Sequence, residues 1–192
     1  MRTILIYIFF LSNFISSMNA QCFKTATSDK FKFEGHTYIL VKNKFSWQNA
    51  AKCAVESGGY LAHINNRREQ KNIFEKLKKT ITNPALTIAN DGGGASYVWL
   101  GGTDLHHEGV WIWDGDNDGI GVQFWQGGVD GNPVGNNFVN WGHEPDNFNG
   151  HQNALAIALT EWPLGIGSLG QPGQWNDLNE NDRLYFLIEI NH

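Results

Sequence analysis

The sequence lacks a long hydrophobic run. Its one extended apolar stretch, residues 4–11, follows Arg2 and leads through small residues to Ala20. A membrane-spanning helix needs about 20 apolar residues, so this stretch is too short for a membrane anchor. Its pattern predicts a secretory signal peptide over residues 1–20, and therefore a secreted, extracellular domain over residues 21–192.

Basic residues are also scarce. Without residues 1–20 the chain has 13 basic residues against 19 acidic ones. This acidic balance argues against nucleic acid or an anionic membrane surface as a partner, and it is compatible with binding of a divalent cation. Charged residues make up 17% and aromatic residues 13%, which predicts one compact domain instead of a disordered tail or a coiled coil.

Cysteine occurs only twice, at Cys22 and Cys53, and both remain after the predicted cleavage. In an oxidising compartment the two can form a disulfide, which would stabilise the fold by roughly 3–4 kcal/mol through loop closure. Two unpaired thiols are the alternative, and we expect the disulfide.

Complete catalytic motifs are missing. His107-Glu108 and His143-Glu144 both begin like a zinc-protease motif, but neither has the second histidine one helical turn later. Residues 167–170 lack the first glycine of a nucleophile elbow, and no glycine-rich phosphate loop is present. We therefore expect a protein that is not an enzyme.

Two helices are predicted in the first half of the chain. Ser46 is a candidate cap for a helix that runs to about Glu56, and Asn66 with Glu69 is a capping-box variant that opens a second helix. The expected buried faces are Trp47, Ala50, Ala51, Ala54 and Val55 for the first helix, and Ile73, Phe74, Leu77 and Ile81 for the second.

Strands are predicted along the whole chain. Residues 31–33 and 36–41 have the aromatic and β-branched content of two strands around a tight turn. In the second half, short apolar segments alternate with long loops rich in glycine, asparagine and aspartate, and such loops usually carry the function. These segments are residues 98–100, 110–113, 154–159 and 184–190.

The order of these segments resembles a C-type lectin-like domain. The resemblance covers nearly all of the chain after the signal peptide, and it implies an α+β fold with two helices and a looped double antiparallel sheet. The matching segments are residues 50–53, 58–62, 98–102, 108–113, 140–147, 175–177 and 185–190.

The resemblance also implies a calcium site that holds a sugar. In sugar-binding members a Glu-Pro-Asn or Gln-Pro-Asp tripeptide, a later Glu and an Asn-Asp pair ligate one calcium ion and contact the sugar. Pro145 matches a cis-proline of the family. The matching metal ligands are Glu144, Asp146, Gln152, Asn176 and Asp177; the implied carbohydrate-binding residues are Glu144, Asp146, Phe148, Gln152 and Asn176.

The sequence departs from the family at two of these positions. The tripeptide is Glu-Pro-Asp, and Gln152 replaces an acid, so the number of carboxylates stays at three while the pattern of sugar-facing donors changes. Calcium prefers six to eight oxygen ligands, which these side chains and sugar hydroxyls can provide. Phe148 stands where galactose-binding members of the family often carry an aromatic residue that covers the apolar face of the sugar, so the resemblance, together with Asp146, favours galactose-type ligands.

Two further acidic segments are weaker candidates for calcium. The family's auxiliary site matches Asp104, Glu108, Asn147 and Asn153, where two amides replace two acids. Residues 114–119 copy the first half of an EF-hand loop, but Trp125 stands where the bidentate Glu belongs, which favours a solvated turn.

The family disulfide normally joins the first-helix cysteine to the closing strand. That strand has no cysteine here, so the resemblance leaves Cys22 as the partner of Cys53. The insertion 123–137 either walls a binding surface or supplies buried aromatic side chains, and the tryptophans at strand positions are expected in the core.

These observations predict a secreted carbohydrate-binding protein that uses Ca²⁺ and performs no catalysis. One alternative is a lectin-like fold that recognises protein or another surface such as ice, with calcium purely structural. The other is a hydrolase with Glu144 and Asp146 as its acid pair. The sequence leaves the oligomeric state open.

Overall fold

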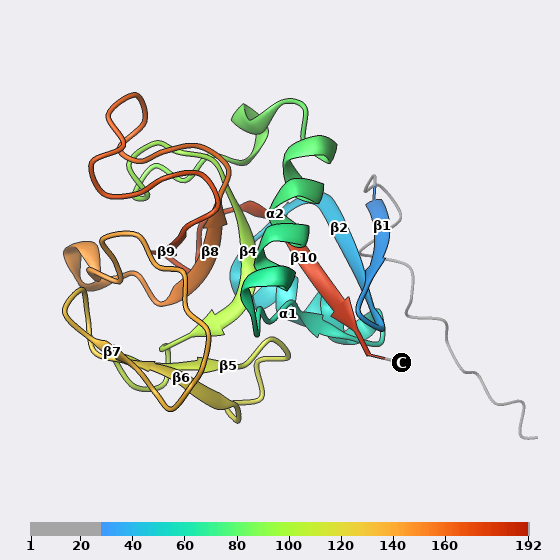
Figure 1. The fold of residues 1–192 in the computed structure, drawn as a ribbon, viewed down its shortest axis with the longest axis horizontal. Coiled ribbons are helices and arrows are strands. Elements are labelled where there is room, and N and C mark those ends of the chain that lie inside the picture. The colour runs from blue at the N-terminus through green and yellow to red at the C-terminus, as the bar shows by residue number, and fades with distance from the viewer. Residues whose placement is uncertain (1–27, 192) are drawn as a thin grey trace, which may run out of the picture.

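The computed structural model describes residues 28–191, so the predicted signal peptide and Cys22 lie outside the described residues. The fold is α+β, with two helices and a ten-stranded sheet in the described part of the chain (Figure 1). The helices are α1 (Trp47–Glu56) and α2 (Arg67–Thr80), and the short 3-10 segments are η1 (Pro84–Thr87) and η2 (Phe148–Gly150). The strands are β1 (Ser28–Phe33), β2 (His36–Phe45), β3 (Tyr60–Leu61), β4 (Tyr97–Thr103), β5 (Val110–Trp113), β6 (Val122–Gln126), β7 (Asn132–Pro133), β8 (Ala154–Ala158), β9 (Trp175–Leu178) and β10 (Leu184–Ile190).

The sheet is continuous and mixed. Its main path runs β1-β2-β10-β4-β5-β6-β7, with β3 beside β10 and β8 bridging β4 and β9. The pairing of β10 with β4 is parallel, whereas the other strand pairings are antiparallel. The predicted α+β class is therefore confirmed, but the expected double antiparallel sheet is one mixed sheet, because the last strand inserts between β2 and β4.

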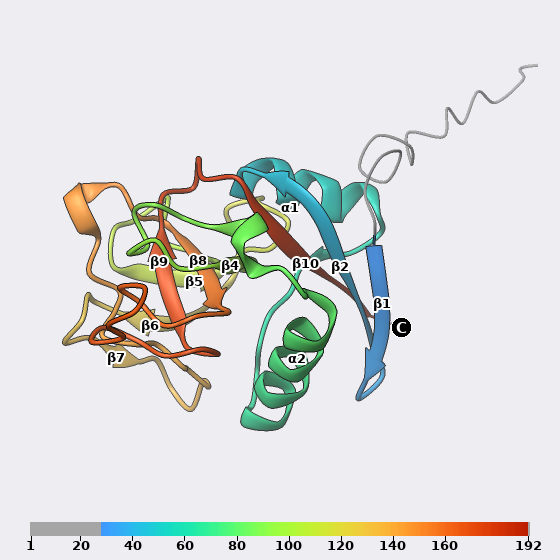
Figure 2. The same cartoon turned by 90° about the horizontal axis from the view of Figure 1, so that it is seen from above.

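The two helices lie on opposite faces of β2 and β10 (Figure 2). Each face has its own hydrophobic core, one built with α1 and the other with α2. Cys53 is buried in the α1 core. Since Cys22 is not described, the disulfide between them stays a prediction.

Helix α1 follows the prediction except in two details. Ser46 stands at the N-cap position, but its side chain makes no hydrogen bond to a described backbone N–H of the helix; its hydroxyl accepts from Asn49 Nδ2 at 2.9 Å. Val55 is half exposed, so its expected burial was wrong. The buried residues of α1 are Trp47, Ala50, Ala51, Cys53 and Ala54, and Val55 lies beyond the edge of this stripe.

Helix α2 begins as predicted. Asn66 accepts hydrogen bonds from the N–H groups of Arg68 and Glu69. The carboxylate of Glu69 accepts from Asn65 N at 2.6 Å, one residue before the cap, and from the Tyr38 hydroxyl at 2.5 Å. The capping acid is therefore buried and ties α2 to β2.

The insertion 123–137 forms β6 and β7, and its aromatic residues Phe124 and Trp125 are buried. They contribute to a cluster of rings around Trp175, which packs edge-to-face against Trp113 at 5.6 Å and Trp141 at 5.9 Å between ring centroids. The interpretation that the insertion supplies buried aromatic side chains is therefore confirmed.

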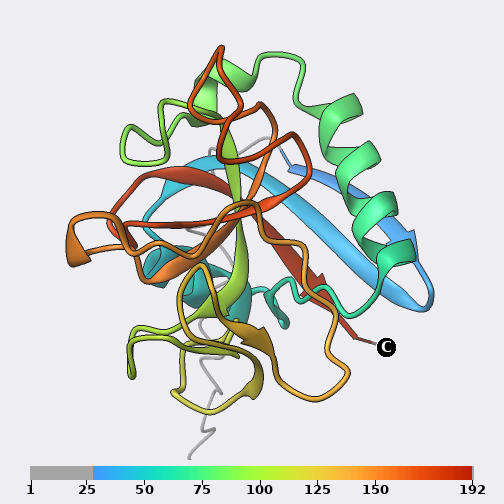
Figure 3. The same cartoon turned by 60° about the vertical axis from the view of Figure 1, so that its left-hand side comes forward.

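This ring cluster joins two distant loops. Trp175 opens β9 and pairs in parallel with Trp141 through an isolated bridge. Gly142 N donates to Trp175 O at 3.0 Å, and Trp175 N donates to Asn140 O at 2.8 Å. The residues that follow Trp141 and those that follow Trp175 are thereby brought to one place (Figure 3).

Within residues 28–191, neither helix has the length and apolar content needed to cross a membrane.

His63 generates a prediction about acid sensitivity. It lies between the rings of Tyr60 and Trp113, and its Nε2 is buried without a partner in the described part of the chain. Burial lowers the pKa of His63 to about 4. The unfolded chain takes up this proton near pH 6.5, so the free energy of unfolding should fall as the pH drops from 6.5 towards 4, by roughly 2–3 kcal/mol.

His63→Phe keeps a ring in this place but cannot be protonated. Urea unfolding of both proteins at pH 7 and pH 4.5, with chelator present, should show a smaller acid-induced loss in the variant. Equal losses in the two proteins would refute this role of His63.

Candidate metal centre

Three carboxylates converge where the two loops meet. Glu144 and Asp146 come from the loop after Trp141, and Asp177 comes from β9; one oxygen of each lies within 4.8 Å of the others. Glu144 is 4% exposed and Asp177 is fully buried, whereas Asp146 faces solvent. The Glu144–Pro145 bond is cis, as the resemblance implied.

Asp177 holds the loop in place through the backbone. Its carboxylate accepts from Asn147 N at 2.8 Å and from Asp146 N at 3.3 Å. Asn147 itself adopts the left-handed conformation, with a φ of 47°. β9 and the loop are therefore connected by hydrogen bonds to a charged acceptor, which are stronger than those between neutral groups.

Trp162 covers one oxygen of Glu144. Its indole Nε1 donates to Glu144 Oε1 at 2.8 Å, and the indole is buried. The second oxygen, Oε2, is buried and finds no hydrogen-bond partner among the described residues. Burying a carboxylate oxygen without a hydrogen-bond donor or a counter-charge costs folding free energy, so Glu144 Oε2 requires a donor or a cation.

The electrostatics of the cluster favour a cation. Burial raises the pKa of Glu144 and of Asp177, and repulsion by the neighbouring carboxylates raises both further. A divalent cation would remove this repulsion and supply the partner that Glu144 Oε2 lacks. The residues present therefore fit a calcium ion.

The two amides are oriented by hydrogen bonds. Asn176 Nδ2 donates to the Tyr97 hydroxyl at 2.9 Å, and this hydroxyl donates to Gly92 O at 2.7 Å, so the amide oxygen of Asn176 is left as an acceptor. Gln152 Oε1 accepts from Phe148 N at 2.8 Å. Glu144, Asp146, Gln152 and Asn176 line one cavity, and Asp177 lies beside Glu144 and Asp146, so the five predicted metal ligands are brought to one place.

A cavity of about 270 Å³ opens beside the cluster. One wall is polar and contains Glu144, Asp146, Gln152 and Asn176. The other lining residues are Phe148, Trp162, Pro163, Leu169, Gly92 and Gly93, with Asn90 and Asp91. A small ligand that has both polar and apolar groups matches this lining.

Three residues of the site were missed by the sequence analysis. Trp162 covers Glu144, Tyr97 orients Asn176, and Asp91 accepts from Gln152 Nε2 at 3.4 Å. Trp162 lies in a loop without periodicity, and Tyr97 is the first residue of an ordinary strand. No local signal marks them, because their partners are distant in the sequence.

The predicted second site is also brought together. Asn147 Nδ2 donates to Glu108 Oε2 at 2.6 Å, and Asp104 N donates to Asn153 O at 3.3 Å. Asp104 is buried, and its Oδ1 has no partner in the described residues. Glu180, which the sequence analysis did not include, accepts from Asn153 Nδ2 at 3.2 Å. Calcium binding at this second site stays a prediction.

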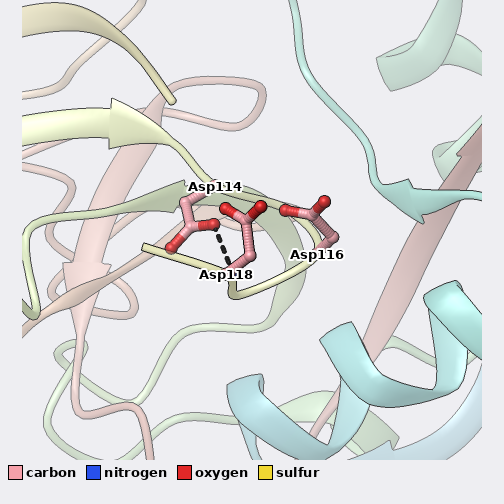
Figure 4. Close-up of side chains that lie close together, drawn as sticks. All are labelled: Asp114, Asp116 and Asp118. Carbon is pink, nitrogen blue, oxygen red and sulfur yellow. Dashed lines mark hydrogen bonds between the residues drawn. The ribbon is translucent and has the colours of Figure 1, made fainter. Parts of the chain in front are cut away.

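Asp114, Asp116 and Asp118 form a separate acidic group, whose side chains gather in one turn (Figure 4). The Asp114 oxygens accept from Asp118 N at 3.0 Å and from Gly119 N at 3.2 Å, whereas the other two carboxylates are exposed. Burial raises the pKa of Asp114. The hydrogen bonds of Asp114 stabilise the turn itself, and the preference for a solvated turn over a calcium site stays a prediction.

The sequence of residues 43–188 matches the model of the lectin C-type domain family. The match spans most of the chain, so the chain belongs to this family. C-type lectin domains typically bind calcium, and the acidic group around Glu144 could hold a metal ion.

Curated relatives include lectins and receptors. The C-type mannose receptor 2 of Homo sapiens is 27% identical over 153 residues, which are 79% of this chain and 8% of the receptor. The CD209 antigen of Papio hamadryas is 25% identical over 132 residues, 68% of this chain and 28% of that protein. The chain therefore spans less than a third of the length of these two relatives. The galactose-specific lectin nattectin of Thalassophryne nattereri is 30% identical over 76 residues, 40% of this chain and 41% of that lectin.

Solved structures share the fold. The carbohydrate-recognition domain of the mouse scavenger receptor C-type lectin has a TM-score of 0.55 at 21% identity, covering 85% of this chain and 94% of that domain. Herring type II antifreeze protein has a TM-score of 0.54 at 18% identity, covering 85% and 97%. One fold thus serves proteins of different function, so the site must decide what this chain binds.

The contact between Trp162 and Glu144 gives a prediction about stability. Trp162→Phe removes the donor from a buried carboxylate, which should lower the free energy of unfolding by about 1–3 kcal/mol beyond the packing loss. Urea unfolding in chelator measures this cost. In a Glu144→Leu background the same substitution should cost clearly less, because no carboxylate needs the donor. Strictly additive costs would show that the indole does not stabilise Glu144.

Proposed function

We propose that this chain is a secreted, calcium-dependent carbohydrate-binding protein with galactose-type ligands and no catalysis. The observation that carries the proposal is the buried oxygen Glu144 Oε2, which has no partner among the described residues and belongs to a cluster of three carboxylates at a cavity.

The first part of the proposal is the calcium site. Glu144, Asp146 and Asp177 supply three negative charges, and Gln152 and Asn176 supply amide oxygens. When bound, a calcium ion offers open coordination positions to hydroxyl oxygens. The side chains of this chain must then fix those hydroxyls by hydrogen bonds, since the protons of metal-bound hydroxyls are good donors.

The second part is the orientation of the sugar. Asp146 is the exposed carboxylate of the cluster, so it is the one that can accept from a hydroxyl at the cavity mouth. Phe148 lines the cavity and is half exposed, which allows its ring to cover the apolar face of a galactose-type sugar. The similarity to a lectin named galactose-specific supports the same ligand class.

The third part is localisation. The predicted signal peptide over residues 1–20 and the C-type lectin-like domain over residues 21–192 support secretion. The acidic charge supports a carbohydrate partner over nucleic acid.

A glycan array probed with and without calcium tests the proposal. We expect binding to galactose-terminated glycans in calcium and release by chelator. Binding to no glycan in calcium would refute it, and stabilisation by calcium without glycan binding would point to a purely structural ion. Turnover of a glycoside would point to a hydrolase instead.

Asp177→Asn should weaken calcium and sugar binding together, with the calcium Kd raised by at least about tenfold, because it removes one of three ligand charges. Titration calorimetry and retention on immobilised galactose measure the two effects. Asp116→Asn is the matched control, since it removes the same charge from the exposed turn. Unchanged sugar retention in Asp177→Asn would show that the site is assigned wrongly.

Phe148→Ala should weaken galactose-type ligands more than mannose-type ones, since only the former present a continuous apolar face to the ring. The side chain is half exposed, so stability should change little. Competition by galactose and by mannose in calcium gives the two affinities. If the affinities for galactose and for mannose fall by the same factor, Phe148 does not stack on galactose-type sugars.

A further inference from the structure

The apolar wall of the cavity continues onto an exposed surface. Trp162 and Pro163 line the cavity, and the loop that follows them presents Leu164, which is 54% exposed, and Ile166, which is 73% exposed. The sequence of residues 162–175 contains no charged residue, although the chain as a whole is acidic. We call Leu164 and Ile166, together with Pro163, the apolar rim.

Hydrogen bonds hold the rim in shape. Leu164 N donates to Gly93 O at 2.9 Å, and Ile166 N donates to Pro163 O at 2.9 Å. The loop before β4 and the loop before β9 therefore lie side by side, as Figures 1 and 3 also show. The two apolar side chains are thus presented to solvent by a hydrogen-bonded turn.

Exposing these apolar side chains to water costs free energy. Single exposed apolar residues are common, but grouped ones next to a binding site usually mark a contact. Phe148, also half exposed, lines the same cavity. A ligand that fills the cavity and extends past its mouth would cover these side chains.

We propose that the natural ligand is a glycoside with an apolar aglycone, such as a glycolipid, whose sugar occupies the cavity and whose alkyl or acyl chain lies on the apolar rim. This inference rests on the proposed carbohydrate function. The rim favours an aglycone as its occupant because Pro163, which lines the cavity, directly precedes Leu164, so a chain that leaves the cavity at Pro163 reaches the rim.

Methyl and octyl β-galactoside, both kept below the concentration at which they form micelles, are the probes. In calcium, the Kd of the octyl compound should be about tenfold or more below that of the methyl compound, as expected from burial of two or more methylene groups. Titration calorimetry measures both values.

The variant Leu164→Ser/Ile166→Ser should bind methyl galactoside with the affinity of the wild type, and it should lose the gain in affinity that the octyl chain provides. Both side chains are exposed, so the variant should fold. Ile120→Ser/Val122→Ser is the matched control. Val122 is the first residue of β6 and Ile120 lies two residues before it; they are 64% and 78% exposed and do not line this cavity, so this variant should keep the gain in affinity from the octyl chain.

The outcomes separate the two proposals. If methyl galactoside binds in calcium and the octyl chain adds nothing, the aglycone proposal is overturned and the carbohydrate function stands. If neither compound binds, both proposals fall. If the wild type sediments as a dimer and the Leu164→Ser/Ile166→Ser variant as a monomer, the rim is instead an interface with a second copy of the chain, and the proposal is overturned.

Discussion

The site depends on the burial of mutually repelling carboxylates. Glu144 and Asp177 are both buried and have oxygens within 4.8 Å of each other, so their repulsion is on the order of 3 kcal/mol at an intermediate effective dielectric constant. The fold tolerates this cost because each carboxylate is partly satisfied, Glu144 by the Trp162 indole and Asp177 by two backbone N–H groups. The oxygen that remains unsatisfied indicates where a cation would bind.

The tryptophan cluster makes that arrangement possible. Trp141 and Trp175 are bridged through their backbones, and each directly precedes a segment that carries predicted metal ligands. Their rings pack in the core with Trp113 and Phe124. The position of the carboxylates is therefore set by hydrophobic packing, and a change in that packing would displace both ligand loops.

Two loops form the walls of the cavity around the candidate metal centre. The loop before β4 contributes Asp91, Gly92 and Gly93, and the loop before β9 contributes Trp162 and Pro163. They contact each other and complete the walls of the cavity. The predicted metal ligands come from the loop after Trp141 and from β9, whereas these two loops give the cavity most of its apolar lining and the rim beyond it.

The family, the two helices and most strands could be predicted from the sequence, because these features depend on local patterns and on short motifs in a fixed order. The five metal ligands stay a prediction that rests on the same motifs. The sequence predicted the cap of α2 correctly but not the exposure of Val55, since burial depends on how wide a stripe the neighbouring sheet covers. The tertiary structure alone decided that Trp162 satisfies Glu144, that Tyr97 orients Asn176 and that Leu164 and Ile166 stand beside the cavity. These are contacts between residues far apart in the chain, and only the packing of the folded protein brings them together.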